Sequence, residues 1–212
     1  MRISVLTPSI RPEGLEITKK CLGEQTFTDF EWLVEIGLGT KHDFNVAMNK
    51  MIKRSKGEIL VILQDFIKVD KDYLKRFHEA YTAKNNLFLS SPVGKVKNLD
   101  FTGEPNWDWR KTSDEKPTWQ MWEIDSGACP REAMFKIGGF DEELDNYWSC
   151  DNVNVGYRAF LAGYDFGVLK ENLAIAYDHD AFIPHPFRRN YHANFNNERM
   201  KLFERGLKVN FL

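Results

Sequence analysis

The chain has 212 residues, 42% of them apolar and 28% charged, which is the composition of an ordinary globular protein with one large domain. Its formal net charge of −2 gives no overall basic field for nucleic acid or a membrane surface, and its apolar runs are far shorter than the roughly 20 residues that span a bilayer. Three cysteines without a paired spacing fit a reducing cytosol, so we expect a cytoplasmic protein without a transmembrane segment, with peripheral attachment to a membrane left open.

Apolar and amphipathic segments alternate along the first 94 residues of the chain. Strands are predicted at 2–9, 29–37, 58–63 and 86–94, and helices at 12–26, 43–57 and 70–84. Residues 59–63 form an uninterrupted apolar run, which is typical of a parallel strand buried on both faces. The alternation therefore predicts an α/β, Rossmann-like fold with a mostly parallel central sheet flanked by helices.

Between residues 94 and 122 the chain becomes polar, aromatic and rich in turn residues. Such a segment is too long for an inert connection in a compact domain, so we expect a functional excursion. The pattern then predicts a turn at 133–144, a helix at 151–166, a late strand at 168–179 and a terminal helix at 196–209. No repeat or glycine-serine linker divides the chain, so residues 1–212 are predicted to form a single domain.

Polar residues follow each of the first three predicted strands: Arg11 after the first, Glu35 after the second, and Gln64 with Asp65 after the third. Each alone has a structural interpretation, such as a helix cap or a surface charge. Together they indicate a binding crevice, because ligands of open α/β sheets bind at the carboxyl ends of the strands. The sequence lacks the glycine-rich loops of dinucleotide and P-loop sites. Its carboxylates suit a divalent cation beside a diphosphate.

Three segments, ISVLTPSIRPEGLEITKKCLGEQTFTDFEWLVEIG, NVAMNKMIKRSKGEILVILQD and REAMFKIGGFDEEL, resemble the GT-A fold glycosyltransferases of the large family-two type. The resemblance covers most of residues 3–165. WSCDNVNVGYR is also similar to the W-x-x-D/E-N/D motif of galactosyl- and N-acetylgalactosaminyltransferases. The resemblance implies a nucleotide-sugar-dependent enzyme, with a nucleotide-binding half over residues 1–93 and an acceptor-binding half with a C-terminal helix over residues 94–212.

The resemblance also implies roles for individual residues. The donor-binding residues that it implies are Thr7, Pro8, Arg11, Glu35, Asn49, Gln64 and Asp65. Gln64–Asp65–Phe66 stands on the metal-binding D-x-D motif, with its acid in the middle position and both outer positions changed. His179 lies where many relatives place a histidine ligand, so Mn²⁺ or Mg²⁺ is expected on Asp65 and His179. The alternatives that stay open are a surface-loop His179, Asp65 as the one protein ligand, another ligand such as His185 or, less favoured, His192, and a reaction without a metal.

Asp151 resembles the acid that takes the proton from the acceptor hydroxyl in inverting relatives. A helix cap is the structural alternative for an aspartate in SCDNVN. The residues expected at the donor sugar or the acceptor are Gly138, Gly139, Trp122, Trp148 and Asn152. The glycine pair permits close approach of the backbone, and tryptophan rings stack on sugars unless they pack in a core.

The expected function is transfer of a sugar from a nucleoside diphosphate, with UDP favoured, to an acceptor hydroxyl, with inversion and with Asp151 as general base. The acceptor stays open among a saccharide, a lipid carrier, a protein and nucleic acid, and the oligomeric state is not predicted. A basic cluster keeps an anionic acceptor open: Arg188, Arg189, Arg199, Lys201, Arg205 and Lys208. The alternatives are a non-catalytic nucleotide-sugar-binding relative with a degenerate D-x-D motif and, less favoured, a nucleotidyltransferase.

Overall fold

The computed structural model describes residues 1–37, 43–146, 151–178, 193–206 and 208–212, with the backbone alone for 146 and 193–195. Within these ranges the central sheet has six strands in the order β2-β1-β3-β8-β5-β9. Their bounds are β2 (Phe30–Ile36), β1 (Ile3–Ser9), β3 (Ile59–Leu63), β8 (Ser126–Pro130), β5 (Leu87–Ser90) and β9 (Asp165–Val168). Only β8 of these described strands runs antiparallel to its neighbours, so the predicted mostly parallel sheet is confirmed.

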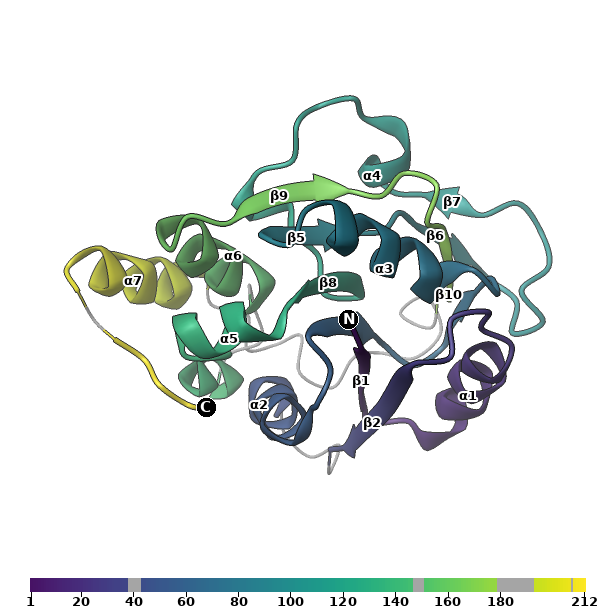
Figure 1. Cartoon of the computed structure of the whole chain (residues 1–212), viewed down its shortest axis with the longest axis horizontal. Coiled ribbons are helices and arrows are strands. Elements are labelled where there is room, and N and C mark those ends of the chain that lie inside the picture. The colour runs from purple at the N-terminus through teal and green to yellow at the C-terminus, as the bar shows by residue number, and fades with distance from the viewer. Residues whose placement is uncertain (38–42, 147–150, 179–192, 207) are drawn as a thin grey trace.

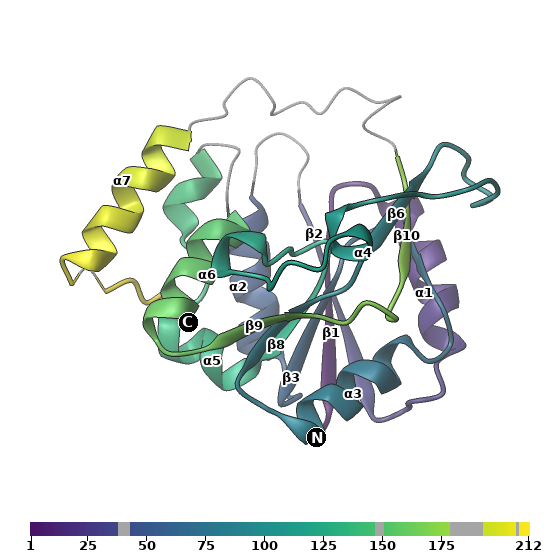
Figure 2. The same cartoon turned by 90° about the horizontal axis from the view of Figure 1, so that it is seen from above.

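Helices cover both faces of this sheet, as the alternation predicts (Figure 2). The described α-helices are α1 (Leu15–Gly23), α2 (Phe44–Arg54), α3 (Tyr73–Ala83), α4 (Trp109–Thr112), α5 (Arg131–Ile137), α6 (Asp151–Leu161) and α7 (Ala193–Glu204). Figure 1 shows α1 and α3 on one side of the sheet and α2, α5 and α6 on the other. No helix in the described part of the chain combines the length and apolar character needed to cross a bilayer.

The alternation of side chains along the strands produces a core on each face of the sheet. Val5 and Val61 pack in the cluster that includes Phe77 of α3, whereas Leu6 and Ile62 pack in the cluster that includes Met48 of α2. Because consecutive strand residues point to opposite faces, the uninterrupted run at 59–63 is buried throughout. The predicted burial of this strand on both faces is therefore confirmed.

Residues 94–122, predicted as an irregular excursion, contain short regular elements and help to form a second sheet. Its described strands, in the order β4-β10-β6-β7, are β4 (Ile67–Val69), β10 (Ala174–Tyr177), β6 (Val93–Val96) and β7 (Asn106–Trp107). Short 3₁₀ helices lie at η1 (Pro12–Gly14), η2 (Trp119–Met121) and η3 (Glu142–Asn146). Strand β8 has small residues in place of β-branched ones, so the pattern did not predict it. It lies between β3 and β5, and thereby joins the two halves of the chain in one sheet.

Candidate functional site

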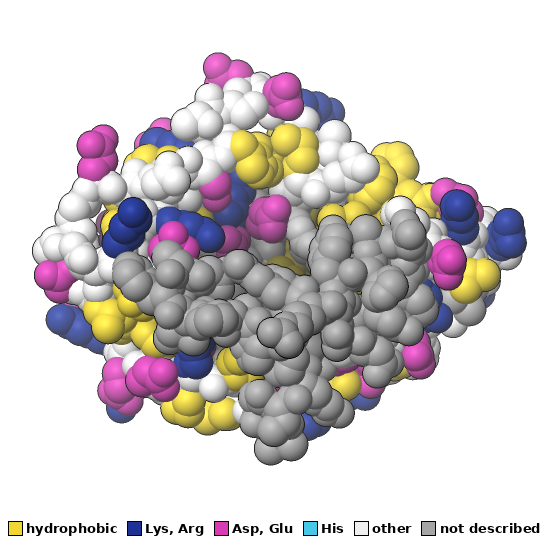
Figure 3. All heavy atoms as spheres, turned by 180° about the vertical axis from the view of Figure 1, so that it is seen from behind, with side chains coloured by type: hydrophobic (Ala, Val, Ile, Leu, Met, Phe, Trp, Pro, Cys, Tyr) yellow, Lys and Arg dark blue, Asp and Glu magenta, His cyan; other side chains and the backbone are white. Residues whose placement is uncertain are grey.

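The parallel strands β1, β2 and β3 end at one edge of the central sheet. In register, Pro8 of β1 lies beside Glu35 of β2, and Leu6 lies beside Ile62 of β3. Strand β1 runs from the near side of Figure 1 to the far side, and Figure 3 shows that far face. Acidic and basic side chains gather on the described part of that face (Figure 3). The predicted convergence of polar groups at this edge therefore has a structural basis.

Asp65 is the second residue after β3, and its carboxylate joins the segments that follow β1 and β3. The Ser9 hydroxyl donates a 2.7 Å hydrogen bond to Asp65 Oδ2, and Arg11 Nη2 lies 3.5 Å from Asp65 Oδ1. The guanidinium of Arg11 lies over the ring of Phe66, 5.6 Å from its centroid. Only 5% of the Asp65 side chain is exposed, so groups from two strand ends hold this carboxylate in place.

Phe66 has a φ of 57°, in the left-handed region that a bulky residue rarely adopts. Its carbonyl accepts a 3.0 Å hydrogen bond from the backbone N–H of Tyr177, and the two rings are 5.8 Å apart. A Cβ on Gly14 would come within 2.4 Å of the Phe66 ring, so this packing requires glycine. Strain of this kind persists where the surroundings impose it, and it concentrates at functional sites.

Thr7 and Glu35, two of the predicted donor-binding residues, have partners within the protein. Thr7 is fully buried, and its hydroxyl accepts a 2.9 Å hydrogen bond from Trp32 Nε1. Thr7 therefore packs in the core, and its contact with a donor stays a prediction. Glu35 forms ion pairs with Lys50 at 3.2 Å and with Arg54 at 3.1 Å, both on α2. Its contact with a nucleotide base stays a prediction, as do those of Pro8 and of the half-buried Gln64.

The amide of Asn49 is used inside the protein, and its contact with the donor stays a prediction. Asn49 Nδ2 donates to the carbonyl of Phe140 and to Glu142 Oε1, both at 2.9 Å, and Asn49 Oδ1 accepts from the N–H of Phe140 at 2.8 Å. Asn49 is only 1% exposed. Its function is to hold the turn at 138–142 against α2.

The glycine pair in this turn permits close approach, as predicted, but its partner is the C-terminal segment of the chain. A Cβ on Gly138 would lie 1.9 Å from the carbonyl oxygen of Val209, and one on Gly139 would lie 2.7 Å from the Leu212 side chain. The Gly138 carbonyl also accepts a hydrogen bond from Phe211. Residues 209–212 occupy the space beside these glycines, and contact of the glycines with the donor sugar stays a prediction.

Asp151 begins α6 and faces the start of α2. Asn45, which is fully buried, donates from Nδ2 to Asp151 Oδ1 at 2.8 Å and to Asp145 Oδ1 at 2.9 Å. Asp145 also accepts from the backbone N–H groups of Asn45 and Val46, so it caps α2 from outside that helix. Asp151 is 8% exposed and is the first residue of α6.

Asn152, the next residue of α6, faces the segment before β8. Its Nδ2 donates to the carbonyl of Trp122 at 2.9 Å and to Glu123 Oε2 at 3.2 Å. The indole of Trp122 is 1% exposed, packs edge-on against Phe88, and donates to the Leu89 carbonyl. Trp122 therefore packs in the core, and its contact with a sugar stays a prediction. The predicted Trp148 lies outside the described residues.

Sequence reasoning missed an array of charged side chains at the same edge. Buried Arg110 of α4 pairs with Asp108 and, at 2.9 Å, with Asp125. The Asp125 carbonyl accepts from the Gln64 N–H at 3.2 Å, which joins this array to the end of β3. Burial, reinforced by the charge of Asp125, raises the pKa of Glu123 to about 7. The sequence signal for this array was the motif WEIDSG, in which two acids separated by one residue precede a strand.

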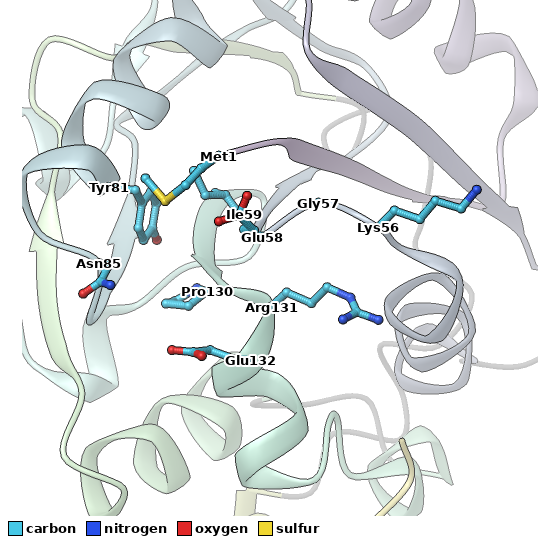
Figure 4. A pocket seen from close by; sticks show the side chains of 10 residues that line it. All are labelled: Met1, Lys56, Gly57, Glu58, Ile59, Tyr81, Asn85, Pro130, Arg131 and Glu132. Carbon is cyan, nitrogen blue, oxygen red and sulfur yellow. The ribbon is translucent and has the colours of Figure 1, made fainter.

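A cavity of about 260 Å³ lies at the opposite edge of the sheet (Figure 4). It is lined by Met1 before β1, by residues 56–59 leading into β3, by Pro130 at the end of β8 and by Arg131 at the start of α5. These are the amino ends of the parallel strands. The cavity is therefore separate from the edge that carries Asp65 and Glu123.

Comparison with known proteins places the chain by its fold. Its sequence matches no protein-family model and no curated protein. The crystal structure of S. aureus TarS 1–349 has a TM-score of 0.61 at 14% identity, over 86% of this chain and 62% of that one. The same TarS fragment in complex with UDP-GlcNAc gives 0.62 at 16% identity, over 84% and 58%. The mannosyltransferase PcManGT from Pyrobaculum calidifontis, in complex with GDP-Man and Mn²⁺, gives 0.61 at 15% identity, over 88% and 58%.

The chain has a glycosyltransferase fold of the GT-A type. This confirms the fold class that the sequence resemblance implied. The chain spans less than two thirds of the length of these three solved structures.

In the GT-A resemblance, Gln64–Asp65–Phe66 occupies the metal-binding D-x-D position. Asp65 is its one carboxylate, and both oxygens contact Ser9 or Arg11. Within the described residues, no group of three or more His, Cys, Asp or Glu side chains is placed to hold a metal ion. The predicted ligand His179 lies outside the described residues. The described part of the chain thus supplies an incomplete ligand set for Mn²⁺ or Mg²⁺, and we assign no reaction step to a metal.

Proposed function

We propose that this chain transfers a sugar from a nucleoside diphosphate to an acceptor hydroxyl. The observation that carries the proposal is the placement, on a GT-A fold, of Arg11 with Asp65 after the strands and of Asp151 at the start of α6. The Arg11 guanidinium beside Asp65 suits a diphosphate, and the Asp151 carboxylate suits an acceptor hydroxyl. The structural neighbours described with UDP-GlcNAc and with GDP-Man support a nucleotide-sugar donor. A UDP-sugar is the proposed donor.

Arg11 is the residue that we expect to bind the donor diphosphate. Its guanidinium is planar and permanently charged, and it presents paired N–H donors to phosphate oxygens. Its Nε is buried without a hydrogen-bond partner, although Nη2 contacts Asp65. Contact with a phosphate would supply that partner and would neutralise charge on the leaving diphosphate. A bound Mn²⁺ or Mg²⁺ ion would add Lewis-acid neutralisation of the same group.

Asp151 is the proposed general base. Its carboxylate would take the proton of the acceptor hydroxyl while the oxygen attacks the anomeric carbon from the face opposite the diphosphate, which inverts that carbon. Asn45 fixes the orientation of the carboxylate through the bond to Oδ1. Among the acceptors left open, an anionic one gains little from Arg199, because its guanidinium pairs with buried Asp141 at 2.7 and 2.8 Å.

Nucleotide release from a panel of UDP-, GDP- and TDP-sugars, with Mn²⁺, Mg²⁺ or EDTA, tests the function. We expect release from at least one donor, and Arg11→Lys should raise its KM about tenfold through loss of one charged hydrogen bond. Arg76→Lys is the matched control, because Arg76 pairs with Asp70 away from this edge. Tight binding of a donor without release, across acceptors and metals, would favour the non-catalytic alternative. If EDTA leaves nucleotide release unchanged, the reaction does not require a metal ion.

A further inference from the structure

Asn152 has an amide whose orientation is fixed by two acceptors. Its Nδ2 donates to the Trp122 carbonyl at 2.9 Å and to Glu123 Oε2 at 3.2 Å. An amide nitrogen carries two hydrogens, and neither a carbonyl nor an ionised carboxylate can donate one. The nitrogen must therefore face these two groups. The carbonyl oxygen Oδ1 of Asn152 is the polar atom left for a ligand.

The backbone of the two acceptor residues is held in place by the sheet. The N–H of Glu123 donates to Ser90 Oγ at 2.9 Å, at the end of β5. Its carbonyl oxygen would lie 2.3 Å from a Cβ on Gly127, so the chain packs closely at this point. Trp122 is locked by its buried indole. A small movement of Glu123 would therefore require a change in the sheet itself.

The strand order places Glu123 beyond the diphosphate position. Along the edge, β2 and β1 come first, β3 with Asp65 follows, and then β8 and β5, which flank Glu123. Neighbouring strands are about 4.8 Å apart, so β8 and β5 lie about 5 to 10 Å from β3. A sugar ring attached to a diphosphate at Asp65 would span such a distance. The same order leaves β1 and β2 for the nucleoside.

We propose that Glu123 is a positioning residue for the donor sugar: it orients Asn152 so that Oδ1 accepts a hydrogen bond from a ring hydroxyl. The inference rests on the proposed function and adds to it a sugar subsite beside Asp151. Its ligand class is a hydroxyl-bearing pyranose linked to a nucleoside diphosphate. Glu123 thus contributes to the affinity for the sugar, whereas residues at β1 and β3 determine the affinity for the nucleotide.

The charged groups around Glu123 give this contact a pH dependence. Burial and the charges of Asp125 and Asp108 raise the pKa of Glu123 from 4.5 to about 7, and the charge of Arg110 opposes them. Above this pH the carboxylate is ionised and accepts from Asn152. Below it the protonated carboxyl is a weaker acceptor, so the hydrogen bond from Asn152 to Glu123 weakens as the pH falls through 7, and only the bond to the Trp122 carbonyl is unaffected.

The test compares the Kd of the donor UDP-sugar with the Kd of UDP. Glu123→Ala should raise the first about tenfold and leave the second unchanged, because one hydrogen bond to the sugar is lost. Glu123→Gln retains an acceptor oxygen, so it should bind the UDP-sugar with little change between pH 6 and pH 8. Asn152→Ala should match Glu123→Ala, and the double variant should be no weaker than either single variant. Equal loss for UDP and UDP-sugar, or additive effects, would overturn the proposal.

A second readout needs no turnover. The side-chain amide resonances of Asn152 in the wild-type chain should titrate with a midpoint near the Glu123 pKa of about 7, and Glu123→Gln should abolish that titration. An amide that does not respond would refute the positioning role even if donors are turned over. A responsive amide in a chain that binds no nucleotide would instead refute the proposed function.

Discussion

The side chain of Asn49 hydrogen-bonds both backbone polar groups of Phe140, at 2.8 Å to the N–H and 2.9 Å to the carbonyl. These two residues are 91 positions apart in the chain. Asn49→Ala would leave both backbone groups buried and unpaired, so we expect a loss of about 2–4 kcal/mol in the free energy of unfolding. Urea denaturation measures this loss. Asn85→Ala, at an exposed asparagine, is the control and should change stability by less than about 0.5 kcal/mol.

Two glycines have nearly the same φ angle but different surroundings, so their substitutions distinguish the cost of backbone strain from the cost of lost packing. Gly138 has a φ of 84° and contacts the carbonyl of Val209, whereas Gly163 has a φ of 86° and open space around it. Gly163→Ala should cost about 1 kcal/mol, from left-handed strain alone. Gly138→Ala should cost more and should expose residues 208–212 to carboxypeptidase, because the new Cβ displaces them. Equal losses in thermal denaturation, with the tail still protected, would contradict the docking of this segment.

Asp151 and Asp145 share the Asn45 amide but should differ in their effects. Asp151→Asn keeps an oxygen that accepts from Asn45, so we expect little change in stability and a fall in turnover of about 10²-fold or more, as for loss of a general base. Asp145→Asn disturbs the bonds to two backbone N–H groups of α2, so it should lower stability by about 1–2 kcal/mol. Full turnover in Asp151→Asn would reduce Asp151 to a structural role.

Glu123 should make stability fall with rising pH. Its pKa is raised by burial from 4.5 to about 7, so the folded chain holds a proton over a range in which the unfolded chain has released it. Wild-type stability should therefore fall between pH 4.5 and pH 7 relative to Glu123→Gln, and the difference should stay constant above pH 7. Unfolding free energies at pH 4.5, 6 and 8 test this. The exposed Glu16→Gln is the control, and a similar profile for both variants would contradict the raised pKa.

Local pattern alone predicted most of the architecture. The apolar run at 59–63 determined a doubly buried strand because burial on both faces leaves no polar position in it. The polar residues after the first and third strands were predicted to meet because parallel strands end at one edge, and the contacts of Asp65 with Ser9 and Arg11 agree. The antiparallel strand β8 was missed, since its pairing with β3 is a contact between distant parts of the chain.

The sequence by itself determined the layered α/β fold and the edge of the sheet at which polar groups gather, because hydrophobic periodicity is a local property of the chain. The tertiary structure decided which of those groups a ligand can reach. It uses Thr7, Asn49 and Trp122 inside the protein and brings Glu123 to the edge instead. A buried polar group must find a partner, and that partner is chosen by packing between distant segments that no local pattern records.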